Sequence, residues 1–225
     1  MAGILYIVAT PIGNLADITL RALETLKSVD IILCEDTRVT KKLLDHYKIS
    51  KQLISYHHHS DARKVNEIKE ILKQGNNVAL VTDAGTPGIS DPGNELISRL
   101  TIEQSNNRTI NVVPIPGPSA VTTALSISGF PTDKFLFLGF PPHKKGRQTF
   151  FQTVAKSEYT TVFYESGHRI TKCLGELASV LEPNRQVVIC RELTKKFETM
   201  YRGTIEEVSK QDIDERGEFV IIVSH

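Results

Sequence analysis

The fold is decided by one stretch of sequence, Thr82-Asp83-Ala84-Gly85-Thr86-Pro87-Gly88-Ile89-Ser90-Asp91-Pro92-Gly93, which directly follows the apolar run Val78–Val81. A short, continuous apolar run followed by a turn that is rich in glycine and proline is typical of a buried parallel strand. The glycines of the turn permit positive φ angles and a close approach of backbone to a ligand, while the prolines restrict the path of the chain. The stretch therefore predicts a ligand-binding loop at the carboxyl end of a strand.

Strand and helix patterns alternate on both sides of this loop. Short apolar runs predict strands, and apolar residues at a 3.6-residue spacing predict the helices between them. The predicted strands of the first half are Ile4–Ala9, Ile31–Cys34, Leu53–Tyr56, Val78–Val81 and Ile110–Val113, and the predicted helices are Ala16–Ser28, Lys41–Tyr47, Asp61–Gln74 and Glu95–Ile102. This alternation is typical of an α/β domain with a mainly parallel sheet.

A proline-rich junction, Pro114-Ile115-Pro116-Gly117-Pro118, divides the chain, because such a run does not fit a central strand or a helix interior. We expect one α/β domain over residues 1–114 and a second over residues 115–225. The second half is predicted to contain helices Ser119–Ser126, Lys145–Ala155 and Arg169–Leu181, and strands Lys134–Gly139, Thr160–Tyr164, Gln186–Cys190, Thr199–Gly203 and Phe219–Val223. The last two strands are expected to pair as a hairpin or meander, so the second sheet should be mixed.

Composition narrows the class of protein. Apolar residues make up 40% and charged residues 24% of the 225 residues, which is typical of a globular chain rather than a disordered or fibrous one. The formal net charge of +1 disfavours a polyanion binder driven by net charge alone. Three separated cysteines without a CxxC spacing favour neither a disulfide framework nor a zinc site, and we expect no metal. We expect no leader, and because the longest apolar runs are strand-sized we expect a cytoplasmic protein without a membrane partner.

Charged clusters follow three of the predicted strands: Glu35-Asp36-Thr37-Arg38, Glu165-Ser166-Gly167-His168-Arg169 and Arg191-Glu192-Leu193-Thr194-Lys195-Lys196. At strand ends they could line a shared cleft, or they could form salt bridges of purely structural value. The basic run His143-Lys144-Lys145-Gly146-Arg147 is either solvated or a phosphate-contacting surface. The consecutive His57-His58-His59 favours an exposed loop over a metal site, because alternate residues of an extended chain point to opposite sides.

Several motifs together carry a family resemblance. They are Tyr6-Ile7-Val8-Ala9-Thr10-Pro11-Ile12-Gly13-Asn14-Leu15, Glu35-Asp36-Thr37-Arg38, the Asp83–Gly93 loop, Pro116-Gly117-Pro118-Ser119-Ala120, Arg191-Glu192-Leu193-Thr194-Lys195 and Gly217-Glu218-Phe219. With these motifs in this order, the sequence resembles the ribosomal RNA small subunit methyltransferase I family, within the tetrapyrrole-methylase-like class of S-adenosylmethionine enzymes. The family usually has proline where this sequence has Gly167.

The resemblance implies two α/β domains with S-adenosylmethionine in the cleft between them, normally in a homodimer. The implied reaction is 2′-O-methylation of a cytidine ribose in 16S ribosomal RNA of the small subunit, near the decoding centre, with no DNA partner. Carried over by motif, the residues expected to bind the methyl donor are Pro11, Asp83, Gly85, Thr86, Ser119, Ala120, Phe163 and Tyr164.

A ribose hydroxyl is a weak acid, so the transfer gains from a base or from a cation beside the forming alkoxide. The catalytic candidates, which the sequence leaves unranked, are Glu35, Asp36, Arg38, Glu165, His168 and Lys195. Three other functions remain open. A tetrapyrrole methyltransferase should have apolar loops for a macrocycle, a nucleotide-dependent enzyme should have a phosphate-binding loop such as GxGxxG or GxxxxGK[ST], and a non-catalytic ribosome-binding module has no use for the Gly/Pro loops.

Overall fold

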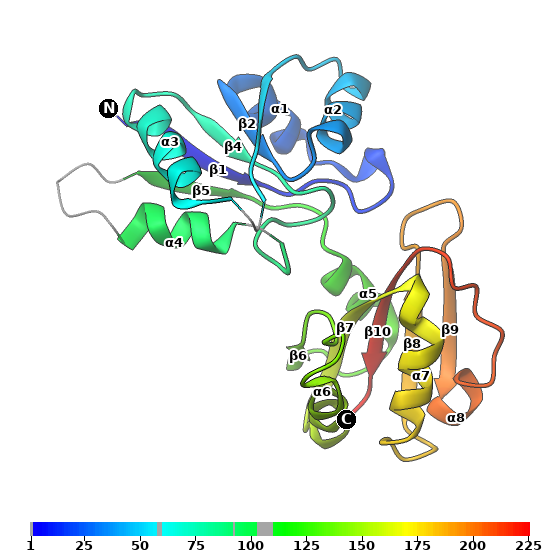
Figure 1. Ribbon diagram of the computed structural model, residues 1–225. Helices are drawn as coiled ribbons and strands as arrows, with labels where there is room; N and C mark the ends of the chain where they lie inside the picture. Colours follow the sequence, from blue (N-terminus) through cyan, green and yellow to red (C-terminus); the bar gives the residue numbers. More distant parts are fainter. Residues whose placement is uncertain (1, 58–59, 92, 103–109) are drawn as a thin grey trace. The chain divides into compact units, whose positions relative to one another are not determined.

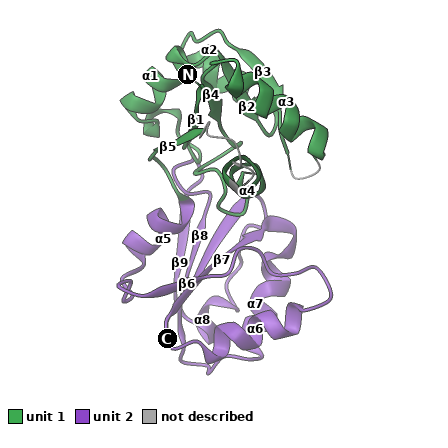
Figure 2. Cartoon of the chain, turned by 90° about the vertical axis from the view of Figure 1, so that its left-hand side faces the viewer, with its two compact units in different colours: residues 1–119 green, residues 120–225 purple. Residues whose placement is uncertain are grey.

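The computed structural model describes residues 2–57, 60–91, 93–102 and 110–225, and the chain divides into two compact units, residues 1–119 and 120–225 (Figure 1, Figure 2). His58, His59 and Pro92, which belong to segments discussed above, lie outside the described residues. The expected division after Pro114 lies inside strand β5 (Asn111–Ile115). Strand β5 is at the edge of its sheet, where proline is tolerated because one side of the strand has no partner.

The first unit is built on a five-stranded sheet in the order β3-β2-β4-β1-β5, and all of its strand pairs are parallel. Its strands are β1 (Ile4–Val8), β2 (Ile31–Cys34), β3 (Gln52–Ser55), β4 (Val78–Leu80) and β5. Its helices are the 3-10 helix η1 (Leu15–Asp17), α1 (Leu20–Ser28), α2 (Thr37–His46), α3 (Ala62–Lys73) and α4 (Asn94–Ile102). The predicted parallel sheet of the N-terminal half is therefore confirmed.

Helices cover both faces of this sheet (Figure 1). Side chains of α1 and α2 pack on one face in a cluster that includes Ile32, while side chains of α3 and α4 pack on the other in a cluster that includes Leu33. Ile32 and Leu33 are neighbours in β2, so alternate residues of one strand supply both cores. This double burial explains why the strands appear in the sequence as continuous apolar runs.

Helix starts are set by side-chain caps. Thr19 accepts a hydrogen bond from the backbone N of Ala22, so α1 begins at Leu20 rather than at the predicted Ala16. In the same way Asp36 caps α2, which begins at Thr37 rather than at Lys41. Asp36, which the sequence places in a charged cluster, is therefore also the residue that caps the start of α2.

The second unit contains a five-stranded mixed sheet in the order β6-β7-β10-β8-β9. Its strands are β6 (Phe135–Phe137), β7 (Thr160–Ser166), β8 (Gln186–Arg191), β9 (Thr199–Thr204) and β10 (Glu218–Val223). Strand β6 is parallel to β7 and the other pairs are antiparallel, which confirms the mixed sheet. The expected pairing of the last two strands is wrong: β10 lies between β7 and β8, because its continuous apolar run suits a central position, and β9 pairs with β8 at the edge.

Helices α6 (Arg147–Lys156), α7 (Ile170–Ala178) and α8 (Ile205–Val208) bury their apolar side chains against one face of this sheet, and the 3-10 helix η2 (Gly167–Arg169) leads into α7. Helix α5 (Ala120–Ser128) contacts β10 and β7. Figure 2 shows α5 on the opposite side of the sheet from α6, α7 and α8. The second unit therefore has its own core. The turn after β7, at Gly167, packs closely against the segment that precedes β10.

The glycine at that turn permits the close packing. A Cβ atom added to Gly167 would lie 1.8 Å from the carbonyl O of Glu215, and the Gly167 N donates a hydrogen bond of 3.0 Å to the carbonyl O of Gly217. An overlap of this size with backbone cannot be relieved by a side-chain rotation. A proline at this position would lack the N–H that reaches Gly217.

We predict opposite effects for the same substitution at two glycines of this region. Gly167→Ala should lower the free energy of unfolding by about 1–3 kcal/mol or more, because the turn must move. Gly175→Ala is the control: Gly175 lies in α7 with open space around its Cβ position, so alanine should stabilise by about 0.5–1 kcal/mol. Urea denaturation measures both, and equal effects of the two substitutions would contradict the packing described.

Candidate functional site at the carboxyl edge of the first sheet

Three loops meet at the carboxyl edge of the first sheet. Thr10 and Gly85 form an isolated β-bridge, with N–O distances of 2.9 and 3.1 Å between their backbones. Gly85 has a φ angle of +85°, which permits this bridge without the steric cost that a side chain would bring. The Thr86 Oγ1 donates a hydrogen bond of 3.1 Å to the carbonyl O of Pro118. The loops after β1, β4 and β5 are therefore joined to one another, as their sequences predicted.

The loop after β2 joins the same edge through a carboxylate. Asp83 Oδ1 accepts a hydrogen bond of 3.1 Å from the backbone N of Asp36, while the Asp83 residue as a whole is exposed. One carboxylate oxygen is thus fixed by the protein and the side chain still faces solvent. Five of the expected donor-binding residues belong to this edge or its loops: Pro11, Asp83, Gly85, Thr86 and Ser119.

Asp36 has a structural function at this edge. Its carboxylate caps α2 and contacts the Arg38 guanidinium, whose Nη2 lies 2.6 Å from Asp36 Oδ2. These hydrogen bonds from Arg38 lower the pKa of Asp36 to about 2. A carboxylate with so low a pKa is a weak base at neutral pH. Arg38 has a side chain that is 86% exposed, so it remains accessible to a phosphate group.

A pocket of about 340 Å³ lies in the first unit beside the Gly/Pro loop. It is lined by Tyr56, His57, Gly88, Ser90, Asp91, Gly93, Asn94 and Glu95. Ser90 has a φ angle of +65°, a left-handed conformation that is uncommon outside glycine and that turns the chain directly before Asp91. The pocket is within the size range of small-molecule sites.

Asp91 is the residue of this edge with the most altered proton affinity, and the sequence analysis did not select it. Burial, followed by the negative charges of Glu35 and Asp83, raises the pKa of Asp91 to about 7. Its position between two glycines of the quoted loop was visible in the sequence. The surrounding carboxylates that raise its pKa come from other loops, so this property depends on the tertiary structure.

Glu165, a catalytic candidate of the second unit, is instead a buried structural anchor. Its side chain is 0% exposed and lies between two guanidinium groups, with Arg169 Nη2 at 2.6 Å and Arg147 Nη2 at 3.4 Å. Its Oε1 also accepts a hydrogen bond of 2.8 Å from the backbone N of Ser166. A carboxylate enclosed in this way holds its neighbours in place and is shielded from solvent.

The other candidates of the second unit have different surroundings. Lys195 Nζ lies 2.8 Å from Glu192 Oε1 and 2.7 Å from Glu218 Oε2. These two hydrogen-bonded carboxylates outweigh the opposing effect of burial and raise the pKa of Lys195, which disfavours it as a base. His168 is exposed in η2.

The remaining expected donor-binding residues also belong to the second unit. Ala120 is the first residue of α5. Phe163 packs its ring in the core beside Phe151, and the residue as a whole, backbone included, is 0% exposed within strand β7. Tyr164, the next residue, is half-buried and lies against Phe137 and Phe140. Among the described residues, no group of three or more His, Cys, Asp or Glu side chains is arranged to hold a metal ion.

Replacing Asp91 by asparagine should change how stability depends on pH. Between about pH 4 and 7 the unfolded chain releases the Asp91 proton while the folded chain retains it, so the contribution of Asp91 to the free energy of unfolding of the wild type falls as the pH rises. The Asp91→Asn variant lacks this contribution, so its stability relative to wild type should increase from pH 4 to pH 8. Urea denaturation of both proteins across this range measures the difference, and a pH-independent difference would contradict the raised pKa.

Replacing Glu165 by glutamine should destabilise the second unit. Arg147 and Arg169 would then be buried or half-buried without one of their negative partners, a change that costs about 3 kcal/mol. The exposed Glu182→Gln provides the matched control and should change the free energy of unfolding by less than about 0.5 kcal/mol. Thermal and urea unfolding compare the two, and a neutral Glu165→Gln would show that the buried pairs are dispensable.

Comparison with known proteins places this arrangement in a family. The model of the family described as Tetrapyrrole (Corrin/Porphyrin) Methylases matches residues 4–209. A protein named ribosomal RNA small subunit methyltransferase I from Haemophilus influenzae is 46% identical, over 99% of this chain and 79% of its own length. The protein of the same name from Vibrio cholerae is 48% identical (99% and 77%), and that from Bacillus subtilis is 46% identical (98% and 75%).

Solved structures share the fold. The methyltransferase CobJ has a TM-score of 0.74 at 17% identity, covering 100% of this chain and 95% of its own. The cobalt precorrin-4 methyltransferase CbiF has a TM-score of 0.70 at 19% identity, covering 98% and 94%. Among the described residues, no helix has the length and apolar character needed to span a bilayer. The chain is therefore a methyltransferase of the tetrapyrrole methylase family, it belongs within it to the ribosomal RNA small subunit methyltransferases I, and its methyl donor is S-adenosylmethionine.

Proposed function

We propose that this protein transfers a methyl group from S-adenosylmethionine to the ribose 2′-hydroxyl of a cytidine in 16S ribosomal RNA, near the decoding centre of the small ribosomal subunit. The observation that carries the proposal is the joined carboxyl edge of the first sheet, where Thr10, Gly85, Thr86 and Pro118 hold three loops together. The choice of RNA as acceptor is supported by the relatives of 46–48% identity that are named for ribosomal RNA.

The residues at this edge suit a cationic methyl donor. Carboxylates from different loops lie close enough to alter one another's proton affinity, among them Glu35, Asp83 and Asp91. A local excess of negative charge attracts a sulfonium and an ammonium group. When bound, S-adenosylmethionine supplies an electrophilic methyl group on positively charged sulfur. Asp83, with one oxygen fixed and the side chain exposed, is suited to accept a hydrogen bond from a ribose hydroxyl.

The loops that are joined beside Asp83 would hold the rest of the donor. Pro11, Gly85, Thr86 and Ser119 lie on the joined loops and offer main-chain groups in a fixed arrangement. Fixed groups lose little entropy on binding and keep the reacting atoms aligned, which is the main requirement for an in-line transfer. Ala120 and Tyr164 remain proposed contacts from the second unit, while Phe163, which is fully buried, would support Tyr164 from within β7.

The acceptor hydroxyl must lose its proton as its oxygen takes the methyl group. Of the carboxylates at the edge, Asp91 has a pKa of about 7, close to the value that suits a general base at neutral pH. The lower pKa of Asp36 makes that group unsuitable. We assign Asp36 and Arg38 to the RNA side of the site, where the exposed Asp36–Arg38 pair is weak enough for a phosphate to compete with it.

A tetrapyrrole methyltransferase is the second candidate, because the family description and the fold neighbours name such enzymes. The exposed Arg38 suits the phosphate of a ribonucleotide, and the relatives of 46–48% identity are named for ribosomal RNA, so RNA is the favoured acceptor. We also expect a homodimer in the cytoplasm, as the resemblance implies, and sedimentation of the purified protein tests the dimer.

The test of the function is methyl transfer from labelled S-adenosylmethionine to unmodified small ribosomal subunits. We expect label in a 2′-O-methylcytidine of 16S ribosomal RNA, identified by nuclease digestion and mass spectrometry. Arg38→Ala should reduce kcat/KM for subunits roughly tenfold, because a charge-assisted phosphate contact is lost, and leave the Kd for S-adenosylhomocysteine within a few-fold.

Arg99→Ala is the matched control for Arg38→Ala. Arg99 also forms an ion pair with an acidic residue close by in sequence, Glu95, and it lies in the last turn of α4. Its replacement should leave transfer unchanged. Equal loss of donor affinity and transfer in Arg38→Ala would contradict the phosphate assignment, and label on a precorrin-type acceptor but not on subunits would replace the proposed function with the tetrapyrrole alternative.

A further inference from the structure

A rigid loop, residues 139–146, follows β6 in the second unit. Three of its carbonyl oxygens are held by donors from β7, η2 and α6. The carbonyl O of Gly139 accepts from the backbone N of Tyr164 at 2.8 Å. The carbonyl O of Pro141 accepts from Arg169 Nη1 at 3.3 Å, and that of Pro142 accepts from Arg147 Nη1 at 3.2 Å.

The two arginines that hold the loop are the two that enclose Glu165. The Glu165 side chain is 0% exposed, and those of Arg147 and Arg169 are 6% and 19% exposed. Buried ion pairs of this kind add little stability compared with apolar side chains of the same volume, but they determine where their members lie. The buried carboxylate therefore holds the two arginines whose side chains also donate to carbonyl groups of the 139–146 loop.

The loop presents an aromatic ring and a group of cations to solvent. Phe140 is 51% exposed, and its ring centroid lies 5.2 Å from that of Tyr164. His143, Lys144 and Lys145 are all exposed. No ion pair with another described residue is found for Lys144 or Lys145. One loop that is held by hydrogen bonds thus presents an exposed ring and two adjacent cations together.

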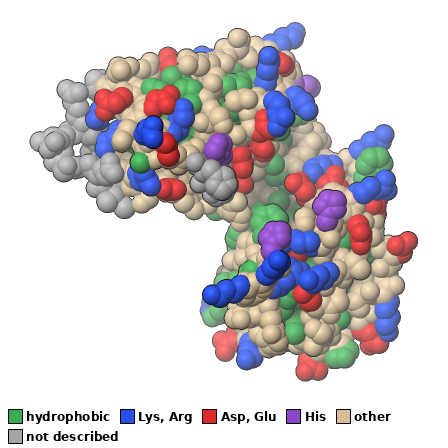
Figure 3. Space-filling model, in the orientation of Figure 1, with side chains coloured by type: hydrophobic (Ala, Val, Ile, Leu, Met, Phe, Trp, Pro, Cys, Tyr) green, Lys and Arg blue, Asp and Glu red, His purple; other side chains and the backbone are tan. Residues whose placement is uncertain are grey.

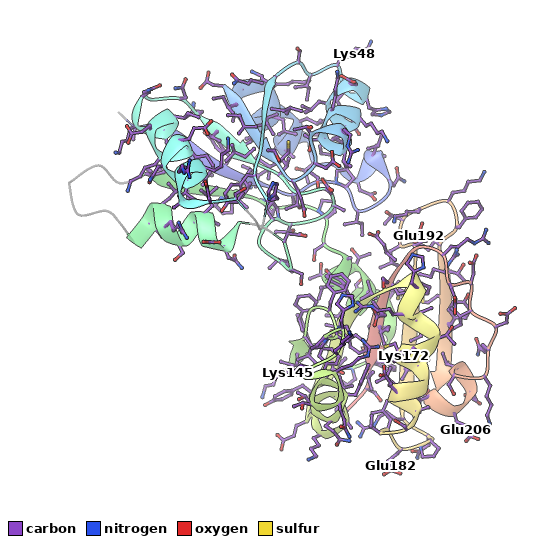
Figure 4. All side chains as sticks on the ribbon, in the orientation of Figure 1. Lys48, Lys145, Lys172, Glu182, Glu192 and Glu206 are labelled. Atoms are coloured by element: carbon purple, nitrogen blue, oxygen red, sulfur yellow. The ribbon has the colours of Figure 1, made fainter. Side chains whose placement is uncertain are left out.

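A neighbouring loop adds to this surface. Strands β6 and β7 are parallel, so the 139–146 loop and η2 leave the sheet at the same edge. His168 is exposed in η2, directly before the Arg169 that contacts Pro141. Figure 3 shows Lys or Arg and His side chains gathered on the visible face of the second unit, and Figure 4 labels Lys145 in the 139–146 loop.

We propose that the 139–146 loop is a contact site for single-stranded RNA, in which Phe140 stacks on an unpaired base and Lys144 and Lys145 bind the adjacent phosphates. An aromatic ring beside lysines is the pattern by which proteins bind unpaired bases and the backbone that carries them. The proposal rests on the proposed function, since it supplies that function with an RNA contact. A second copy of the chain is the alternative occupant of this surface, and the test below distinguishes it from RNA.

The test measures equilibrium binding of the fluorescently labelled full chain to purified small ribosomal subunits by anisotropy, at several salt concentrations. The Lys144→Ala/Lys145→Ala variant should bind roughly tenfold more weakly and should lower the slope of log Kd against log salt by about 1–2. Lys156→Ala/Lys210→Ala removes the same charge from the end of α6 and the turn after α8, and should leave both quantities unchanged.

Variants at Phe140 separate stacking from charge. Phe140→Leu keeps an apolar side chain but removes the ring, so Kd should rise roughly 5- to 100-fold with no change of the salt slope. Phe140→Tyr keeps the ring and should bind as the wild type does. Tyr159→Ala is the control, because Tyr159 is a similarly exposed ring (44%) at the amino end of β7, and it should leave Kd unchanged.

The outcomes distinguish this proposal from the proposed function. Loop variants that bind subunits as tightly as wild type, in a protein that still methylates them, overturn the RNA contact and leave the function standing. A change in sedimentation of the loop variants with unaltered RNA affinity assigns the surface to a second copy and also overturns the contact. A wild type that neither binds nor methylates subunits overturns both.

Discussion

Strand β1 lies between β4 and β5 with parallel pairing on both sides, and this placement is the constraint on which the site depends. Parallel strands all end at the same edge, so three loops far apart in sequence must leave the sheet within reach of one another. The bridge between Thr10 and Gly85 and the bond from Thr86 to Pro118 then fix their separation. A ligand at this edge meets backbone that folding has already ordered, which reduces the entropy cost of binding.

Charge is distributed differently at the corresponding edge of the second sheet. In the first unit, Glu35, Asp83 and Asp91 place carboxylates near one another, and burial together with the negative charges of Glu35 and Asp83 raises the pKa of Asp91. In the second unit, the acidic Glu165 is buried as a counter-charge and the lysines of the 139–146 loop remain exposed. An acidic edge suits a cationic donor and a basic loop suits a phosphate backbone, so each unit has the charge that one of the two proposed substrates requires.

Sequence patterns predicted the strands and helices, whereas the surroundings of single side chains depend on the fold. The Gly85, Gly88 and Gly93 positions all adopt the positive φ angles that their loop was expected to need. Glu165, by contrast, followed a strand as a catalytic carboxylate would, but it lies between two arginines in the folded unit. Its sequence neighbours included Arg169 and not Arg147, so half of its environment was invisible in the linear pattern. Asp91 was passed over for the same reason, because the charges around it come from other loops.

The sequence by itself determined the alternation of strands and helices, the parallel first sheet and the bends after β1, β4 and β5. These depend on local preferences: apolar runs, capping residues such as Thr19 and Asp36, and the backbone freedom of glycine. Only the tertiary structure decided that β10 lies between β7 and β8, and which carboxylates are buried, paired or open to a ligand. Strand order and proton affinity depend on contacts between residues that are far apart in the sequence. No single stretch of the chain therefore determines them.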